Sequence, residues 1–513
     1  MLGTFSALIL TLGSLQRSTS LGVVVGERDA ILGTDSWLGI PYAAPPIGEG
    51  RWMPPRNATP WSTPRHANHF GASCAQIGSF QGPGLHEEPF GLSVADAFGE
   101  PVGSEDCLTL NIWRPTAEAG TLPVIVFIHG GANVAGYTAD PLYHGARLAV
   151  GANAVVVTLN YRLGVFGWFA HPSLDPVAGN LGLLDIIKAL EFVRSNARVF
   201  GGDPQNVTVV GQSAGAVNAF GLMVSPLATD LFHKVVALSG ALRTAPLAAR
   251  HAYANEVLKR LLLNDRTAAD TLAASRVITE RGPDWARDYL RSRTAADLVR
   301  AAHGVPGSGF ETRDGVAIPK DPEQAVRDRN YRAVPLWIGE AASEGKFFVQ
   351  GAYRITDADR FRKMLQHDPT QPESLSLSDV LKPDIATAAG FAAASAPSNA
   401  VITGLIEGTL QLIAAEQPNV YASRFSWESP DEPWRSLMGS MHGMDLPFLF
   451  GNFGPSYYSA SFGEGTRSER EALSRTMMSH LAAFVRTGDP NFDAHGAPWR
   501  PYPGGGMRLL GTK

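Results

Sequence analysis

The apolar residues in the first half of the chain form short continuous runs, and these runs alternate with stretches of helical period. LPVIVFI (residues 122–128) and AVVVTL (154–159) are two such runs, and GLLDIIKALEFVRSNARVF, from residue 182, repeats apolar residues at helical spacing. Continuous runs are typical of strands buried on both faces, and strands alternating with helices imply parallel crossovers. The pattern predicts an α/β fold with a mainly parallel central sheet flanked by helices.

The rest of the chain extends this pattern and then interrupts it. Further strand-like runs are NVTVV, KVVAL, AVPLWIG and VYASRFSW, and a helix is predicted to begin at Ala214. Ala- and Arg-rich helical segments dominate at about 245–330, and a second helical stretch covers about 355–415. No long Pro/Gly/Ser linker separates these segments, so we interpret them as helical additions above the sheet of one domain, residues 21–513.

Residues 1–20 have features of a leader segment. The apolar run from Phe5 to Leu15 is too short to span a bilayer but suits the core of a signal peptide, and Ser18-x-Ser20 fits a small-residue cleavage site. We predict a signal peptide here, and hence a secreted or periplasmic protein. Because no Lys or Arg precedes the run, the alternatives are a buried N-terminal strand or a start-site artefact. No other segment has the pattern of a membrane span, so no membrane anchor is expected.

Composition narrows the function classes. The 513 residues are 44% hydrophobic with a net charge of -5, which argues against a nucleic-acid-binding protein because such proteins usually present a basic face. The two cysteines, Cys74 and Cys107, are an even pair that would form a disulfide in an exported protein and stay buried thiols in a cytosolic one. Such a disulfide would stabilise the fold by about 3–4 kcal/mol.

A serine lies between two glycines in GQSAG, residues 211–215, where a predicted strand meets a predicted helix. In a nucleophile elbow the G-x-S-x-G turn exposes the serine hydroxyl, and its glycines allow close backbone contact. The start of the following helix would place N–H groups near a developing oxyanion. Ser213 is therefore the candidate nucleophile, and a purely structural turn is the alternative.

A second glycine-rich segment, FIHGGAN, ends the strand predicted at 122–128. Loops of this HGG type supply backbone N–H groups to an oxyanion hole. By position the donors would be Gly131 and Ala132, with Ala214, the residue after the nucleophile, as the third. The alternative is a glycine-rich turn; the segment lacks the Gly-Lys-Ser/Thr ending of a phosphate loop.

Two further residues have the positions that an acid and a base require. Glu344 follows the strand PLWIG, and His442 lies in the loop SMHGMD ahead of an apolar segment. A single histidine is commonly a structural residue. The chain order Ser213, Glu344, His442 is, however, the α/β-hydrolase order of nucleophile, acid and base. We therefore predict these three residues as the catalytic set.

Several long segments resemble the type-B carboxylesterase family, relatives of cholinesterases and fungal lipases. In family order they are WLGIPYAAPPIGEGRWMPP, SEDCLTLNIWRP, NYRLGVFGWF, GNLGLLDIIKALEFVRSNARVFGGDPQNVTVVGQSAGA and MHGMDLPFLFG. The similarity covers nearly the whole chain after about residue 21 and is densest at 101–241. It implies the α/β-hydrolase fold and hydrolysis of small-molecule carboxylic esters through an acyl-enzyme on Ser213.

The resemblance also implies structural pairings. Cys107 matches the cysteine of the family's first disulfide. Arg51 with Glu105, and Arg162 with Asp185, match two ion pairs. We interpret both pairs as architectural, and buried pairs often add little net stability.

The sequence departs from the family pattern at positions that bear on the substrate. Gln212 stands where many relatives carry a glutamate, and the segment 75–106 has no tryptophan to serve as a cation–π platform. Both departures argue against a cationic ester. Ala132 replaces the third glycine of the usual loop and keeps its N–H, but its methyl narrows the site, which predicts a preference for unhindered esters.

Other activities of the same fold remain alternatives. The chemistry of a serine triad also serves amides, thioesters and lactones, and lipases use the same machinery. Non-catalytic adhesion relatives lose the nucleophile or the histidine, and both are present here. The thirteen histidines show no H-E-x-x-H motif or Cys/His cluster, so we expect no metal and no cofactor.

Overall fold

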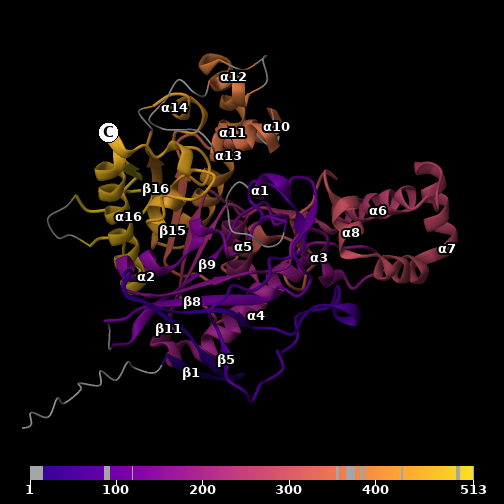
Figure 1. Cartoon of the computed structure of the whole chain (residues 1–513), viewed down its shortest axis with the longest axis horizontal. Coiled ribbons are helices and arrows are strands. Elements are labelled where there is room, and N and C mark those ends of the chain that lie inside the picture. Colours follow the sequence, from indigo (N-terminus) through magenta and orange to yellow (C-terminus); the bar gives the residue numbers. More distant parts are fainter. Residues whose placement is uncertain are drawn as a thin grey trace, which may run out of the picture.

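The structure is a computed structural model that describes residues 15–85, 93–117, 120–353, 358–365, 376–381, 385, 387–428, 431–492 and 497–511. Its centre is a ten-stranded sheet (Figure 1). Across the sheet the strands are β17 (Met507–Gly511), β16 (Val420–Ser426), β15 (Leu336–Ala341), β12 (Lys234–Leu238), β11 (Gly202–Gln212), β9 (Leu122–Ile128), β10 (Val155–Leu159), β8 (Thr109–Pro115), β4 (Thr34–Pro41) and β3 (Glu27–Asp29).

The sheet is mixed. From β17 to β10 every pair of neighbours is parallel, whereas β8, β4 and β3 pair antiparallel at the other end. Each continuous apolar run predicted as a strand coincides with one of the parallel strands. The α/β fold with a mainly parallel sheet is therefore confirmed, with an antiparallel edge contributed mostly by the N-terminal strands.

Both faces of the sheet are covered, which explains why its strands are continuously apolar. In β9, Val124 and Val126 join the core beneath α4 (Leu181–Asn196), α5 (Ala214–Val224) and α13 (Ala388–Ala414). The alternate residues Ile125 and Phe127 join the core beneath α2 (Ala146–Ala152), α15 (Asp445–Phe450) and α16 (Arg467–Thr487). Successive strand side chains point to opposite faces, so a strand between two helical layers needs apolar residues at every position.

Three helices project from one side of the molecule as a lobe (Figure 1, right). They are α6 (Leu247–Asn264), α7 (Thr271–Ser292) and α8 (Ala295–Ala302), and they share an apolar cluster that includes Leu258, Leu290 and Leu298. The rest of the range 245–330 holds β14 (Glu311–Arg313) and α9 (Pro322–Arg327), and β14 pairs with β13 (Thr244–Pro246). The range predicted as a second helical addition holds α11 (Ala358–Leu365), α12 (Leu377–Val380) and α13.

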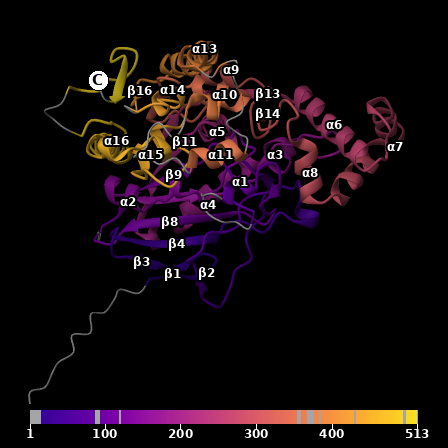
Figure 2. The ribbon, with the colours of Figure 1, turned by 45° about the horizontal axis from the view of Figure 1, so that its top comes forward.

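Helix α13 is the most apolar of these additions. Among the described residues it is the one helix long and apolar enough, by length and composition, to cross a membrane. It contributes Ile406 and Leu410 to the same core as Val124 and Val126 of β9, and it packs against α10 (Gly345–Tyr353), β15 and β16. Figure 2 shows α13 on the side of the molecule opposite β1 (Gln16–Thr19) and β2 (Gly22–Val25).

The predicted leader overlaps the folded domain. Residues 1–14 lie outside the described residues, but β1 pairs antiparallel with β2. The carbonyl of Leu15 accepts hydrogen bonds from Trp37 Nε1 at 2.8 Å and from Gly26 N at 3.1 Å. Cleavage at residue 20 would therefore remove a strand that the N-terminal sheet contains.

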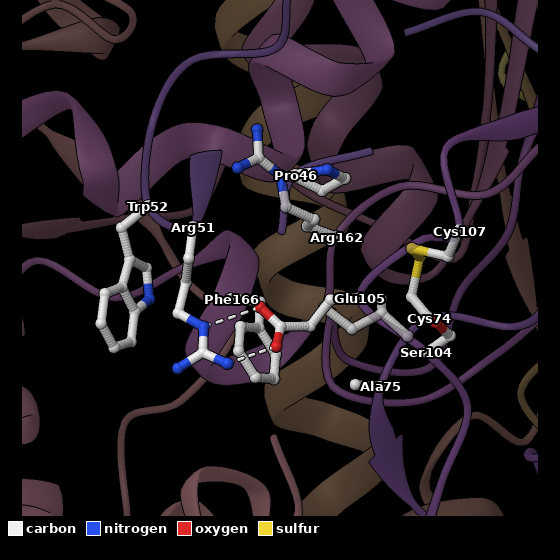
Figure 3. A pocket seen from close by; sticks show the side chains of 11 residues that line it. Pro46, Arg51, Trp52, Cys74, Ala75, Ser104, Glu105, Cys107, Arg162 and Phe166 are labelled. Atoms are coloured by element: carbon white, nitrogen blue, oxygen red, sulfur yellow. Dashed lines mark hydrogen bonds and ion pairs between the residues drawn. A yellow bond between two sulfur atoms is a disulfide. The ribbon is translucent and has the colours of Figure 1, made fainter. Parts of the chain in front are cut away.

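Cys74 and Cys107 form a disulfide, as predicted for an exported chain (Figure 3). Beside it, Arg51 Nε donates to Glu105 Oε2 at 2.8 Å, and Arg51 Nη1 donates to the carbonyl of Arg293 at 2.7 Å. Through these two contacts Arg51 ties the segment after α7 to the N-terminal part of the domain.

The second ion pair expected from the resemblance is also present. Arg162 and Asp185 are buried and meet through two bonds, Nε to Oδ2 at 2.8 Å and Nη2 to Oδ1 at 2.7 Å. The Arg162 N–H also donates to Asp185 Oδ2, and Nη1 donates to the carbonyl of Met53. These bonds fasten the loop after β10 to α4, which supports the architectural interpretation.

Candidate active site

The predicted site residues come from neighbouring loops at one edge of the sheet. β9, β11, β12 and β15 are adjacent and parallel, so their carboxyl ends lie together. Gly131 follows β9, Ser213 follows β11, and Glu344 follows β15. In open α/β sheets, ligands bind at this edge, outside the carboxyl ends of the strands.

Ser213 joins β11 to α5 in a strained conformation. Its backbone has φ 57° and ψ −123°, a positive-φ region that residues other than glycine rarely adopt. Its N–H donates to the carbonyl of Leu238 at 2.8 Å, and its own carbonyl accepts from Ala216 N and Val217 N at 2.9 and 3.0 Å. These bonds hold the turn on both sides, which is the arrangement of a nucleophile elbow.

The two glycines of the motif are required by close backbone packing. A Cβ at Gly211 would lie 2.1 Å from the carbonyl oxygen of Gly215. A Cβ at Gly215 would lie 2.0 Å from the carbonyl oxygen of Ile128, where β9 ends. The elbow can therefore turn this tightly only because Gly211 has no side chain, and α5 can approach the end of β9 only because Gly215 has none.

The loop after β9 faces Ser213 across this contact. Gly131, Ala132 and Asn133 have φ values of 96°, 54° and 59°, so three successive residues have positive φ. Ala132 is exposed, whereas Ala214, at the start of α5, is buried. The three residues predicted as oxyanion donors, Gly131, Ala132 and Ala214, thus lie on the two segments that meet at the elbow.

A buried amide and a phenol hold this loop, and sequence reasoning did not identify them. Asn133 Nδ2 donates to the carbonyl of Gly309 at 2.8 Å, and Asn133 Oδ1 accepts from Asn218 Nδ2 at 2.9 Å. The Tyr161 hydroxyl lies 3.0 Å from Asn133 Oδ1 and 2.9 Å from the carbonyl of His129. These bonds anchor the loop at Asn133 and at His129, just after β9 ends.

His442 and Glu344 are buried and in contact. His442 Nδ1 lies 2.5 Å from Glu344 Oε2, and Glu344 Oε1 accepts from Ala341 N at 2.8 Å. The carbonyl of His442 accepts from the hydroxyl of Tyr458 at 3.1 Å. A carboxylate only accepts hydrogen bonds, so Nδ1 carries the proton in this contact and the neutral ring keeps Nε2 as an acceptor.

Gln212 and Asp445 also approach this pair. Gln212 is buried, and its Nε2 lies 3.3 Å from His442 Nε2, so an uncharged amide lies beside the imidazole ring. Burial, with a smaller contribution from the neighbouring Glu344 carboxylate, raises the pKa of Asp445 to about 7, so its carboxyl is largely protonated at lower pH.

A cavity of about 350 Å³ opens at the elbow. Ser213 and His442 both line this cavity, together with Ala132 and Ala214. The remaining lining is largely apolar and comes from the loop after β9, α5, the loop after β12, the loop before β14, α10 and α13: Asn133, Val217, Ser239, Gly240, Ala241, Arg243, Ser308, Gly309, Phe310, Phe348, Ser398, Ile402, Leu405 and Ile406.

A second cavity of about 230 Å³ lies on the other side of the Ala132 loop. Ala132 and Ser308 line both cavities, and the second is walled by residues such as Phe80, Tyr253 and Val299. The loop after β9 therefore separates two spaces of unequal size. In the part of the chain that the structure describes, no group of three or more His, Cys, Asp or Glu residues could hold a metal ion.

Known proteins of one family resemble this chain along nearly its whole length. The profile of the Carboxylesterase family matches residues 13–511. The chain is 31% identical to a para-nitrobenzyl esterase of Bacillus subtilis (strain 168), over 93% of this chain and 91% of that protein, and 31% identical to a cocaine esterase of Homo sapiens, over 93% and 84%.

Solved structures show the same likeness. A thermophilic PNB esterase superposes with a TM-score of 0.74 at 28% identity, covering 97% of this chain and 96% of that one. A carboxylesterase of Geobacillus stearothermophilus has a TM-score of 0.73 at 30% identity, with the same coverage. The chain therefore belongs to the carboxylesterase family and is a carboxylic ester hydrolase with the α/β-hydrolase fold.

Proposed function

We propose that Ser213, His442 and Glu344 form a catalytic triad that hydrolyses esters through an acyl-enzyme. The main support is one arrangement: the strained Ser213 and the base His442 line the same cavity, and the other ring nitrogen of His442 contacts the buried Glu344. Glu344 keeps Nδ1 protonated, orients the ring and offsets the charge that His442 acquires.

The reaction then follows two matched steps. Ser213 Oγ attacks the ester carbonyl while His442 Nε2 accepts its proton, and the acyl–oxygen bond breaks as Nε2 returns that proton to the leaving alkoxide. Water then attacks the acyl carbon as Nε2 accepts its proton, and the bond between that carbon and Ser213 Oγ breaks as Nε2 returns the proton to Oγ, which releases the acid. The amide of Gln212 gives up its long contact with Nε2 when the Ser213 hydroxyl donates there.

The oxyanion of each tetrahedral intermediate is bound by backbone N–H groups of Gly131, Ala132 and Ala214. Ala132 and Ala214 line the cavity beside Ser213, and Gly131 precedes Ala132 in the positive-φ loop after β9. Each such donor typically lowers the barrier by about 2.7–4 kcal/mol.

The lining of the site favours unhindered, non-cationic esters. The methyl group of Ala132 stands between the two cavities and restricts bulk near the carbonyl. Gln212 puts a neutral amide where an acid would attract a cation. Tertiary-alcohol esters should therefore react far more slowly than primary ones, and equal rates would reject the preference.

We propose that the protein is exported, into the periplasm or the medium. The Cys74–Cys107 disulfide supports this because disulfides persist in oxidising compartments. A leader that ends before Leu15 would leave β1 in its sheet, whereas one ending at Ser20 would not. N-terminal sequencing of the exported protein tests both the export and the cleavage position.

Kinetics of triad variants test the mechanism. With p-nitrophenyl acetate we expect Ser213→Ala and His442→Gln to lower kcat by about 10⁴-fold or more, and Glu344→Gln by about 10³–10⁴-fold, with unchanged thermal unfolding. Ser239→Ala is the matched variant because Ser239 lines the same cavity and its buried hydroxyl has no hydrogen-bond partner among the described residues. It should stay at least about a hundredfold more active than Ser213→Ala, and the reverse order would reject the assignment.

A further inference from the structure

We propose that this site prefers esters that carry a carboxylate away from the scissile bond, and that Arg243 binds that carboxylate. The inference rests on the proposed function of Ser213 and specifies the class of its substrate. Of the described residues that line the Ser213 cavity, Arg243 is the one with a permanent charge. Most of the others are apolar or small, so this guanidinium is the strongest electrostatic feature that a substrate meets there.

Strand pairing fixes the position of Arg243. It immediately precedes β13, and Phe310 immediately precedes β14; these strands are parallel with Thr244 opposite Glu311. That register places the two preceding residues side by side, and the guanidinium carbon of Arg243 lies 4.6 Å from the centroid of the Phe310 ring. Leu242 N also donates to Thr409 Oγ1 at 3.1 Å, which anchors the loop to α13.

The charge lies within reach of the reacting carbonyl. Gly240 packs directly on the elbow, because a Cβ there would lie 2.9 Å from the carbonyl oxygen of Ser213. Arg243 is three residues further along, a chain distance of at most about 11 Å. A substrate with a few methylene groups between its ester and its carboxylate can therefore span from Ser213 to the guanidinium.

The guanidinium is available to a ligand. The side chain is exposed, and among the described residues no Asp or Glu forms an ion pair with it. Stacking on Phe310 uses the face of the guanidinium and leaves its in-plane N–H groups free. A planar fork of this kind matches a carboxylate through two parallel hydrogen bonds.

Two pairs of substrates test the inference. The first compares p-nitrophenyl hydrogen glutarate with p-nitrophenyl hexanoate and places the carboxylate on the acyl side. The second compares the acetate ester of δ-hydroxyvaleric acid with pentyl acetate, followed by pH-stat, and places it on the alcohol side. The readout is the anionic-to-neutral ratio of kcat/KM, measured for the wild type and for variants of Arg243.

We expect the ratio for at least one pair to fall about tenfold in Arg243→Gln, as loss of a charge-assisted hydrogen bond implies, and to change less than about threefold in Arg243→Lys. About 0.5 M NaCl should lower the wild-type ratio because the site is open to solvent. Arg281→Gln is the matched control: Arg281 is also exposed and stacked, over Trp285, but lies on α7 in the outer lobe. It removes the same charge and should keep the wild-type ratio.

The outcomes separate this inference from the proposed function. The inference is overturned, and the proposed function is not, if Ser213 is needed to hydrolyse the neutral esters but Arg243→Gln has the wild-type anionic-to-neutral ratio of kcat/KM for both pairs. An equal fall of the ratio in Arg281→Gln also overturns it, because net charge would then explain the effect. Absence of Ser213-dependent hydrolysis of the neutral esters overturns the proposed function and this inference with it.

Discussion

Substitution of Gly215 by alanine separates helix propensity from the packing that builds the elbow. Gly215 is the second residue of α5, where alanine would by itself favour the helix by up to about 1 kcal/mol. The new Cβ would, however, lie 2.0 Å from the carbonyl oxygen of Ile128 and 2.9 Å from that of His129. Real Cβ atoms keep at least 3.0 Å from such atoms, so α5 and the end of β9 must separate by about 1 Å.

That displacement determines the expected result. Overpacking typically costs about 1–3 kcal/mol, so after a helix gain of about 1 kcal/mol the unfolding free energy should fall by about 0–2 kcal/mol. The loop after β9 carries Gly131 and Ala132, and a 1 Å misplacement of catalytic groups costs on the order of 10²-fold in rate. Gly215→Ala should therefore lose much more activity on p-nitrophenyl acetate than its thermal unfolding indicates.

Gly408→Ala is the matched control for this experiment. Gly408 lies in α13, and a Cβ there would meet nothing within 4 Å. This variant should be stabilised by about 0.5–1 kcal/mol and should keep its activity. A folded Gly215→Ala protein with wild-type kcat/KM would refute the reasoning, since the elbow would then not depend on the contact with Ile128.

Three further predictions follow from the site and its surroundings. Tyr161→Phe removes the hydroxyl shared by the carbonyl of His129 and Asn133 Oδ1, so kcat on p-nitrophenyl acetate should fall about tenfold with little change in KM; an unchanged kcat would contradict this. The pKa of Asp445 is about 7 in the folded protein against an ordinary 3.8, so the folded state binds this proton more tightly than the unfolded chain does. The free energy of unfolding therefore falls as pH rises from about 4 to about 7, and the total loss above pH 7 is ~4 kcal/mol. Asp445→Asn should therefore gain stability over the wild type between about pH 5 and pH 8 in urea unfolding, and a pH-independent difference would count against the shift. Joint replacement of Cys74 and Cys107 by serine should lower the unfolding free energy by about 3 kcal/mol, and equal urea midpoints for the two proteins would show that the disulfide adds nothing.

The sequence was most informative where one physical requirement dominates. The parallel strands were predictable because burial on both faces demands apolar residues at consecutive positions, as in β9 and β10. The serine elbow was predictable because only glycine fits at Gly211 and Gly215. The antiparallel end of the sheet was not predicted, because β4 and β8 mix polar and apolar residues and their direction depends on distant partners.

The remaining site features depend on contacts between distant parts of the chain. Asn133 and Asn218 are 85 residues apart, and only the fold brings their amides together. The Gln212 side chain reaches His442 across 230 residues, a contact that a single letter in a motif does not reveal. The position of Arg243 depends on the pairing of β13 with β14, two strands of three residues each that carry no periodic signal of their own.

The most direct test of the central claim is to identify the nucleophile. Incubation of the protein with diethyl p-nitrophenyl phosphate, followed by mass spectrometry of its peptides, locates the residue that attacks an electrophilic ester. The account predicts one diethylphosphoryl group per chain on Ser213, release of one equivalent of p-nitrophenol, and no labelling of Ser213→Ala. Labelling of Ser239 in place of Ser213, or full esterase activity after Ser213 is blocked, would contradict it.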